Sequence, residues 1–251
     1  MADSAGPMSA REETREVPPG AAWNAVEDAF LKRRSVRKFK DKQVPEHLIR
    51  RILEVARFSA SQGNCQPWKF VVVRDRAMLD EMEQYVAGMC TMLREQIDYM
   101  SLEKGAPEWE QRWNTAQMLQ KADPNKLHPI PFGAIALIGA GRLAVFHNAP
   151  TVILLLKDVR GVGSPDVDIG ICGTSITVTA HSLGLGTCWV GFAQSLNQDP
   201  GWCERLGVKH PYEISQAIVV GYPVGNPTRN YVDRETHEIV WFEDGKKRVE
   251  Y

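Results

Sequence analysis

The chain has 251 residues, 43% of them hydrophobic, which is enough for one domain with a sizeable core. Lys and Arg number 30 against 31 Asp and Glu, and this balance excludes a net charge that would attract nucleic acid or an anionic membrane. The five cysteines include no CxxC pair, which argues against a metal site or disulfide framework and favours a cytoplasmic location. No apolar stretch is long enough to span a bilayer, so we expect a soluble protein.

The first part of the chain combines a tail with two helices. Residues 1–22 are rich in Ser, Gly, Glu and Pro and predict a disordered N-terminal tail, which leaves 23–251 as a single domain. Residues 23–32 predict a short amphipathic helix that ends at a basic run. Pro45 suits the start of a second helix with a helical apolar stripe, and a polar loop then leads into a strand at 70–73.

The later elements alternate helices with short apolar strands. Asp75 predicts the N-cap of a long helix that runs toward Tyr99. Residues 101–147 are mixed, because 108–122 looks helical whereas the prolines at 124, 129 and 131 predict breaks. Beyond them we expect strands at 151–156, 188–190, 216–220 and 239–242, and a helix over 169–183 that ends at Gly184-Leu185-Gly186.

A basic run follows the first helix and consists of Arg33, Arg34, Ser35, Val36 and Arg37. Three guanidinium groups and a hydroxyl within five residues are the donors that a phosphate monoester needs. By itself the run is more often a solvated basic helix end that complements the helix dipole. Its meaning therefore depends on other segments.

A second segment, Ser61-Gln62-Gly63-Asn64-Cys65-Gln66-Pro67-Trp68, carries amide side chains that both donate and accept hydrogen bonds. Gly63 lets the backbone approach a ligand, so the loop suits the edge of a planar heteroaromatic ring. In isolation the segment is more often a helix-to-strand connection with Trp68 in the core.

In this order, the RRSxR run, the amphipathic helix, the SxGNxQPW loop and the later turn at 184–191 resemble the nitroreductase family. The resemblance covers residues 23 to 229. It implies an α+β, nitroreductase-like fold with a central mixed sheet flanked by helices, and an intertwined homodimer with FMN in two interfacial sites. NADH or NADPH would be the electron donor.

The same resemblance implies roles for individual residues. Arg33, Ser35 and Arg37 would contact phosphate and ribityl, with Arg34 and Val36 beside the flavin and Arg229 closing the phosphate site. The loop of one subunit would lie against the flavin held by the other through Ser61, Gly63, Asn64 and Gln66. The backbone of Trp189, Val190 and Gly191 would approach flavin N5, and Val190 stands where many members carry a polar or acidic residue.

Residues 101–147 are a long version of a segment that covers the substrate face of the flavin in this family. Within or beside this cover, Trp109, Trp113 and Phe132 could stack a flat substrate, and Glu95 and Tyr99 could meet its polar end. Ordinary packing is the more common role for such residues.

The resemblance thus predicts an FMN-dependent oxidoreductase that acts on a small aromatic acceptor of the nitroaromatic or quinone type, without a catalytic side chain or metal. No nucleic-acid or membrane partner is expected. A reductive dehalogenase or ene-type reductase of the same fold, a non-catalytic flavin-binding module, and a purely structural basic surface remain alternatives. The sequence carries no GxGxxG turn to indicate which nicotinamide nucleotide is preferred.

Overall fold

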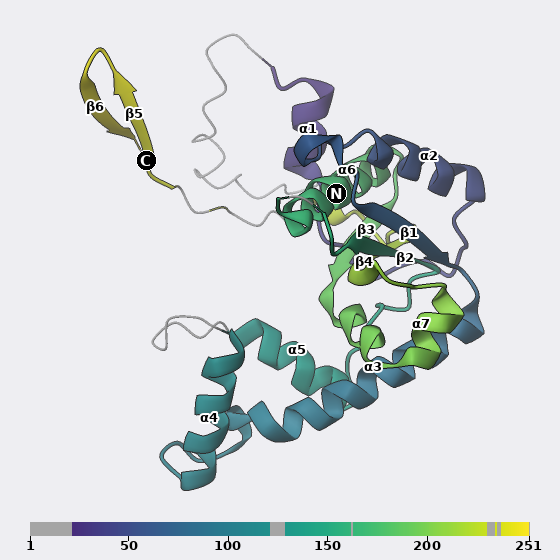
Figure 1. Cartoon of the computed structure of the whole chain (residues 1–251), viewed down its shortest axis with the longest axis vertical. Helices are drawn as coiled ribbons and strands as arrows, with labels where there is room; N and C mark the ends of the chain where they lie inside the picture. The colour runs from purple at the N-terminus through teal and green to yellow at the C-terminus, as the bar shows by residue number, and fades with distance from the viewer. Residues whose placement is uncertain (1–21, 121–128, 162, 230–233, 235–236, 251) are drawn as a thin grey trace, which may run out of the picture.

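The computed structural model describes residues 22–120, 129–161, 163–229, 234 and 237–250. Figure 1 shows a sheet with helices on both sides, and an arm that projects from this body. The helices are α1 (Ala25–Lys32), α2 (Glu46–Arg57), α3 (Arg76–Ile97), α4 (Pro107–Gln120), α5 (Pro129–Gly139), α6 (Pro165–Ser182) and α7 (Pro200–Leu206). Short 3-10 turns are η2 (Gln62–Asn64), η3 (Tyr99–Ser101), η4 (Gly191–Gln198) and η5 (Pro227–Arg229).

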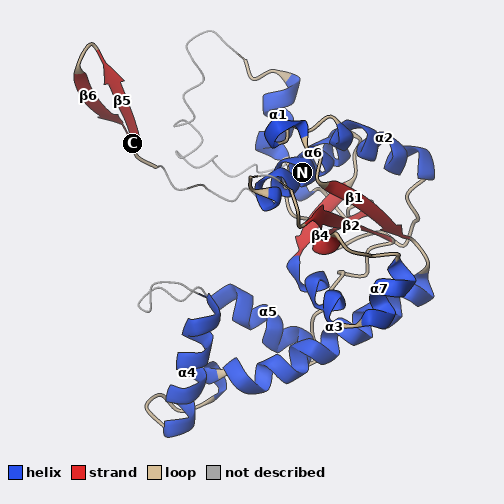
Figure 2. Cartoon of the chain, in the orientation of Figure 1, coloured by secondary structure: helices blue, strands red, loops and turns tan. Residues whose placement is uncertain are grey.

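The central sheet contains β1 (Trp68–Val73), β2 (Thr151–Asp158), β4 (Tyr212–Gly221) and β3 (Gly186–Val190), in this spatial order. All three strand pairs are antiparallel, and Ser35 adds a parallel bridge to Thr187 at the β3 edge. Helices alternate with these strands along the chain, and Figure 2 shows the helices in blue around the red sheet. Because the strands pair antiparallel and, among the described residues, the parallel pairing is confined to the Ser35 bridge, the expected α+β class with a mixed sheet is confirmed.

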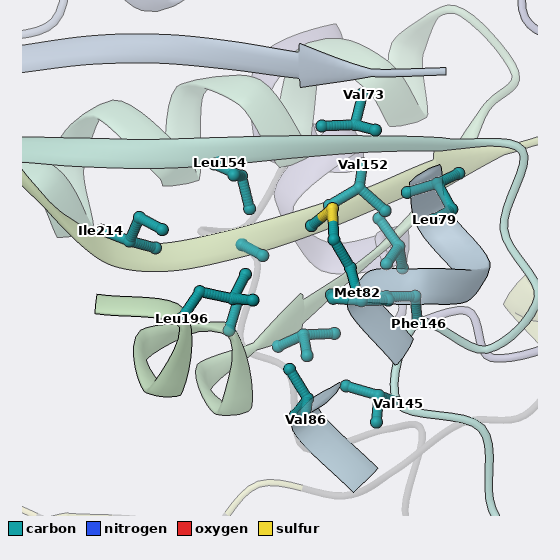
Figure 3. Packing of buried hydrophobic residues seen from close by; sticks show 14 of the residues in the cluster. Val73, Leu79, Met82, Val86, Val145, Phe146, Val152, Leu154, Leu196 and Ile214 are labelled. Carbon is teal, nitrogen blue, oxygen red and sulfur yellow. The ribbon is translucent and has the colours of Figure 1, made fainter. Parts of the chain in front are cut away.

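Both faces of the sheet are buried, which explains why β2 is continuously apolar instead of alternating. On one face, Val152, Leu154 and Leu156 pack with residues of α3 and η4; Figure 3 shows Leu154 and Val152 above Met82, Phe146 and Leu196. On the other face, Ile153 and Leu155 pack with α2 and α6. The result is a helix–sheet–helix sandwich.

Local signals set several helix ends where the sequence places them. Asp75 caps α3 by accepting the Met78 N–H at 2.7 Å. Pro45 is the N-cap of α2, one residue before the first helical position. The helix expected at 169–183 is α6, which begins four residues earlier because Pro165 at N1 starts it.

The break predicted at Pro131 is wrong, because α5 runs through this residue. The break predicted at Pro129 coincides with the first residue of α5, and Pro124 lies outside the described residues. Pro129 and Pro131 both fall in the first turn of α5, where the backbone N–H groups have no intrahelical partner to lose. The start of α4 agrees with expectation within one residue, but the end predicted at Ala122 lies outside the described residues, as does the tail at 1–21. Together with the end of α3, α4 and α5 form the arm.

The chain ends in a hairpin of β5 (Ile239–Glu243) and β6 (Lys246–Glu250), which stands apart from the body in Figure 1. All ten of its strand residues are exposed, including the aromatic Trp241 and Phe242. Across the described residues, every helix is too short or too polar to traverse a lipid bilayer.

Candidate functional site

Backbone pairing attaches the basic run Arg33–Arg37 to β3. The Val36 N–H donates to the Thr187 carbonyl at 2.8 Å. The buried Val36 side chain covers Gly186, where a Cβ would lie 2.7 Å from it, so glycine permits this close approach. The run is therefore not a free helix end, and the β3 turn at 189–191 follows directly beside it.

A second backbone contact brings the C-terminal part of the sheet domain to the same place. Val224 N–H donates to Lys38 O at 3.0 Å, and Lys40 N–H donates to Tyr222 O at 2.8 Å. These bonds place η5 beside the run, with Pro227 facing it. Arg229 ends η5, but its side chain lies outside the described part of the chain.

The run lines a cavity of about 510 Å³ that is strongly basic. Arg33, Arg34, Arg37, Lys38 and Arg234 contribute cations, and Ser35 and Asn226 contribute neutral polar groups. The described residues that line the cavity include no Asp or Glu, so the described lining carries a net positive charge. Such a cavity favours an anion with several acceptor oxygens.

The charges in this cavity act on one another. Burial, and then the positive charges of Arg34 and Arg234, lower the pKa of Arg33. The Arg34 guanidinium also donates to the carbonyls of Leu31 at 2.6 Å and Arg33 at 2.8 Å, and so caps the end of α1. An anion bound here would relieve the repulsion between these cations.

Arg37 also lines a second cavity, an apolar slot of about 550 Å³. One wall is the β3 turn with Trp189, Val190 and Gly191, and the opposite wall is α5. Apart from Arg37, the polar side chains on its lining are those of His147 and Cys188. Because Arg37 belongs to both cavities, a ligand with an anionic end and a flat apolar end could occupy the two together.

The β3 turn presents main chain to this slot. Val190 is 4% exposed and packs into the core, and the Trp189 ring rests on α6 at Gly173. Burial raises the pKa of the Cys188 thiol, so it stays neutral near pH 7, as does Cys172, whose pKa rises to about 12. Both thiols are buried, as is typical of structural cysteines.

The loop with Ser61, Gly63, Asn64 and Gln66 lies elsewhere in the same chain. It sits against the N-terminus of α6, where the Gln62 N–H donates to Asp168 Oδ1 at 3.2 Å. The opposite end of α6 carries His181, whose pKa is lowered by burial and then by the charges of Arg33 and Arg34. An 18-residue helix is roughly 27 Å long, so one chain does not bring the loop to its own basic run.

Four of the candidate substrate residues lie on the arm and are not among the described residues that line the slot of their own chain: Glu95, Tyr99, Trp109 and Trp113. Tyr99 packs edge-on against Trp113 with ring centroids 4.9 Å apart, and Trp109 stacks on Trp113 at 5.3 Å. This cluster attaches α4 to η3. Glu95 is exposed beside a separate polar cavity, and the Phe132 side chain lies outside the described part.

Sequence reasoning missed part of the slot. His147 and Asn148 precede β2 in the chain, and both adopt a left-handed backbone conformation with a φ of 53°. Glu83 of α3 holds the preceding residues by accepting the N–H groups of Val145 at 2.5 Å and Phe146 at 3.1 Å. Asn148 is of a type enriched at positive φ, but nothing local marks His147 or the α5 wall.

The family model described as "Nitroreductase family" matches residues 30–222, which include the run, the loop and the β3 turn. The chain belongs to the nitroreductase family. The resemblance found in the sequence is thus confirmed. Among the described residues of this nitroreductase-family chain, no group of three or more His, Cys, Asp or Glu side chains could hold a metal ion.

Two curated relatives and one solved structure show the range of this nitroreductase family. A putative NADH dehydrogenase/NAD(P)H nitroreductase of Archaeoglobus fulgidus is 48% identical over 191 residues, which are 76% of this chain and 81% of the relative. Iodotyrosine deiodinase 1 of Pongo abelii is 35% identical over 201 residues, or 76% of this chain but only 59% of that protein. A Bacteroides fragilis nitroreductase with bound FMN shares the fold, with a TM-score of 0.57 at 18% identity, over 86% of this chain and 95% of its own.

Proposed function

We propose that this chain is an FMN-dependent oxidoreductase that takes electrons from NADH or NADPH and passes them to a small aromatic acceptor of the nitroaromatic or quinone type. The observation that carries the proposal is the basic cavity joined through Arg37 to an apolar slot at the β3 turn. The names of the relatives support a nicotinamide-dependent reductase.

The two cavities fit FMN by chemistry. A phosphate monoester carries a charge of about −1.5 to −2 near pH 7, and the basic cavity supplies cations and the Ser35 hydroxyl to bind it. The apolar slot suits a flat ring. When bound, FMN would supply the chemistry of accepting a hydride and releasing electrons to an acceptor.

The protein's own residues would bind FMN, orient it and shield it from water. Arg33, Arg37 and Arg229 would hold the phosphate end, and the main chain at Val190 and Gly191 would face the ring. Backbone N–H dipoles placed there stabilise negative charge that develops on a ring. Leu137, Ile138 and Phe192 make the slot apolar and limit water. Protons can come from solvent, so we assign no catalytic acid or base.

We further propose a homodimer in which each site uses both chains. The loop 61–66 and the basic run lie at opposite ends of α6, so two antiparallel copies of α6 would bring the loop of one chain to the run of the other. The outer face of α6 supports this contact, because Val167 is 59% exposed, Ile171 is 39% exposed and Thr174 is also exposed.

The test is the absorbance spectrum of the purified protein, followed without oxygen as NADH or NADPH is added. We expect a bound flavin that is bleached by the nucleotide and recovers its colour with a nitroaromatic or quinone. Protein that is colourless and cannot be reconstituted with FMN would refute the proposal. Flavin that binds but is never bleached would instead favour a non-catalytic flavin-binding module.

Arginine variants test the phosphate end. Arg37→Ala and Arg229→Ala should each weaken FMN binding roughly 10- to 100-fold, because each removes a charge-assisted hydrogen bond. Arg50→Ala is the matched control, since Arg50 lies on the surface of α2 and pairs with Glu46. Flavin fluorescence measures the dissociation constants. Unchanged affinity in Arg37→Ala would remove this residue from the site.

A second candidate is a reductive dehalogenase, favoured by relatives named iodotyrosine deiodinase. In a dimer the arm of one chain could reach the slot of the other and offer Glu95, Tyr99, Trp109 and Trp113 to an aromatic substrate. A kcat/KM for a halogenated phenol well above that for a nitroaromatic would support this candidate, and absence of turnover would eliminate it. An ene-type reductase would be recognised by activity on conjugated double bonds.

A further inference from the structure

The loop 61–66 contains one residue, Gln66, whose backbone conformation is sterically disfavoured. Gly63, Asn64 and Gln66 adopt left-handed φ values of 57°, 56° and 48°. Glycine adopts this region without steric cost and asparagine is enriched there, but glutamine is not, and Gln66 is also followed by a proline, which favours extended conformations. A loop of this shape needs contacts that hold it.

Most of the contacts around the loop lie within it and would move with it. Ser61 Oγ accepts the Gln66 N–H at 3.0 Å, and the Gln66 amide donates to Asn64 Oδ1 at 3.1 Å. One hydrogen bond links the loop to the rest of the described chain through the Gln62 N–H, which donates to Asp168 Oδ1 at 3.2 Å. Asp168 belongs to the first turn of α6.

Asp168 is an unusual residue for a purely structural position. It is 4% exposed, and its Oδ2 atom has no hydrogen-bond partner among the described residues. A buried carboxylate with one unsatisfied oxygen is destabilising, and the helix N-terminus offsets only part of this. The carboxylate is therefore explained better by what it holds than by its contribution to the fold.

We propose that Asp168 is a positioning residue that fixes the loop 61–66 to α6 in the shape in which the loop closes the cofactor site of the partner chain. This inference rests on the proposed function. Because α6 carries both Asp168 and the exposed face assigned to the dimer contact, the same helix sets the distance between the loop and the partner's Arg37.

Single variants test the anchor by FMN affinity and by the melting temperature of the apoprotein. Asp168→Ala should weaken FMN binding by at least about tenfold while the protein stays folded and dimeric. Asp168→Asn keeps an acceptor oxygen toward Gln62 and should restore most of the affinity. Asp166→Asn is the matched control on the same helix turn, since Asp166 pairs with Lys157 at the surface, and it should bind FMN like the parent.

A second pair of variants changes the hydrogen-bond donor, Gln62, instead of the acceptor, Asp168. This pair tests the same anchor even if Asp168→Ala does not fold. Gln62→Pro lacks the N–H that Asp168 accepts, whereas Gln62→Ala keeps it. We expect weakened FMN binding in Gln62→Pro and near-parental binding in Gln62→Ala. Parental affinity in both Asp168→Ala and Gln62→Pro would overturn the proposal, as would equal losses in Gln62→Pro and Gln62→Ala.

A hybrid dimer tests whether the anchor acts across the interface. Co-expression with two affinity tags yields dimers with Asp168→Ala in one chain and Arg37→Ala in the other. If the loop serves the partner, both defects meet in one site and the other site keeps parental FMN affinity. If each loop serves its own chain, both sites are weakened and the proposal is refuted. A parental protein that binds no FMN would refute the proposed function instead, so the two failures are distinguishable.

Discussion

The Trp189 ring rests on α6 at a position where only glycine leaves room. A Cβ on Gly173 would lie 2.0 Å from Cη2 and 2.4 Å from Cζ2 of Trp189, and these ring atoms are not the end of a flexible chain. We therefore expect Gly173→Ala to force the ring or the helix to move. Overpacking of this kind costs about 1–3 kcal/mol.

Replacing a helical glycine by alanine also stabilises the helix by about 1 kcal/mol, and a control must separate this gain. Gly88→Ala provides it, because Gly88 lies inside α3 and a Cβ there meets no atom within 4 Å. The difference between the two variants in free energy of unfolding should be about 1–3 kcal/mol, with Gly173→Ala the less stable.

Urea denaturation of the apoprotein at one fixed protein concentration measures both values, since association would otherwise shift the midpoint. The double variant Gly173→Ala/Trp189→Phe should lose less free energy of unfolding than the two single variants lose together, because Phe lacks the clashing ring atoms. Equal stability of Gly173→Ala and Gly88→Ala would refute the reasoning.

Two further predictions concern titratable groups. Iodoacetamide should reach Cys90 and Cys172 only after unfolding, since both are buried and burial raises the pKa of Cys90 to about 11. Peptide mass spectrometry would contradict this if either cysteine reacted as fast in native protein as in urea. Burial, and then the charge of Arg37, lower the pKa of His147 below its ordinary value of 6.5. As the pH falls, the unfolded chain therefore binds a proton at this residue before the folded chain does. The folded state should lose stability as the pH falls below about 6.5. Urea titrations from pH 7.5 to 5 should show a shallower loss in His147→Asn, and an unchanged slope would exclude this contribution.

The elements that sequence reasoning located well carry their own local signals. The Asp75 cap, the apolar run of β2 and the glycines after α6 each act over a few residues, and the structure has these elements where they were expected. The helix α5 was missed because the position of a proline within a turn, and not its presence, decides whether a helix can form.

The site itself was only partly accessible from the sequence. The basic run and the β3 turn meet through the Ser35–Thr187 bridge, a pairing across about 150 residues that no local pattern encodes. The same holds for His147 and the α5 wall, which long-range packing brings to the slot. Only the family resemblance linked these segments in advance, and the roles of their individual residues stay predictions.

The long helix α3 determines how the arm can move. Its first turns place Leu79 and Met82 in the core below the sheet, and its last turns carry α4 and α5. At 22 residues it is roughly 33 Å long, and it contains no proline at which a helix commonly kinks. Because α3 is one unbroken helix, a displacement of α5 at the slot would be transmitted along α3 to the core below the sheet.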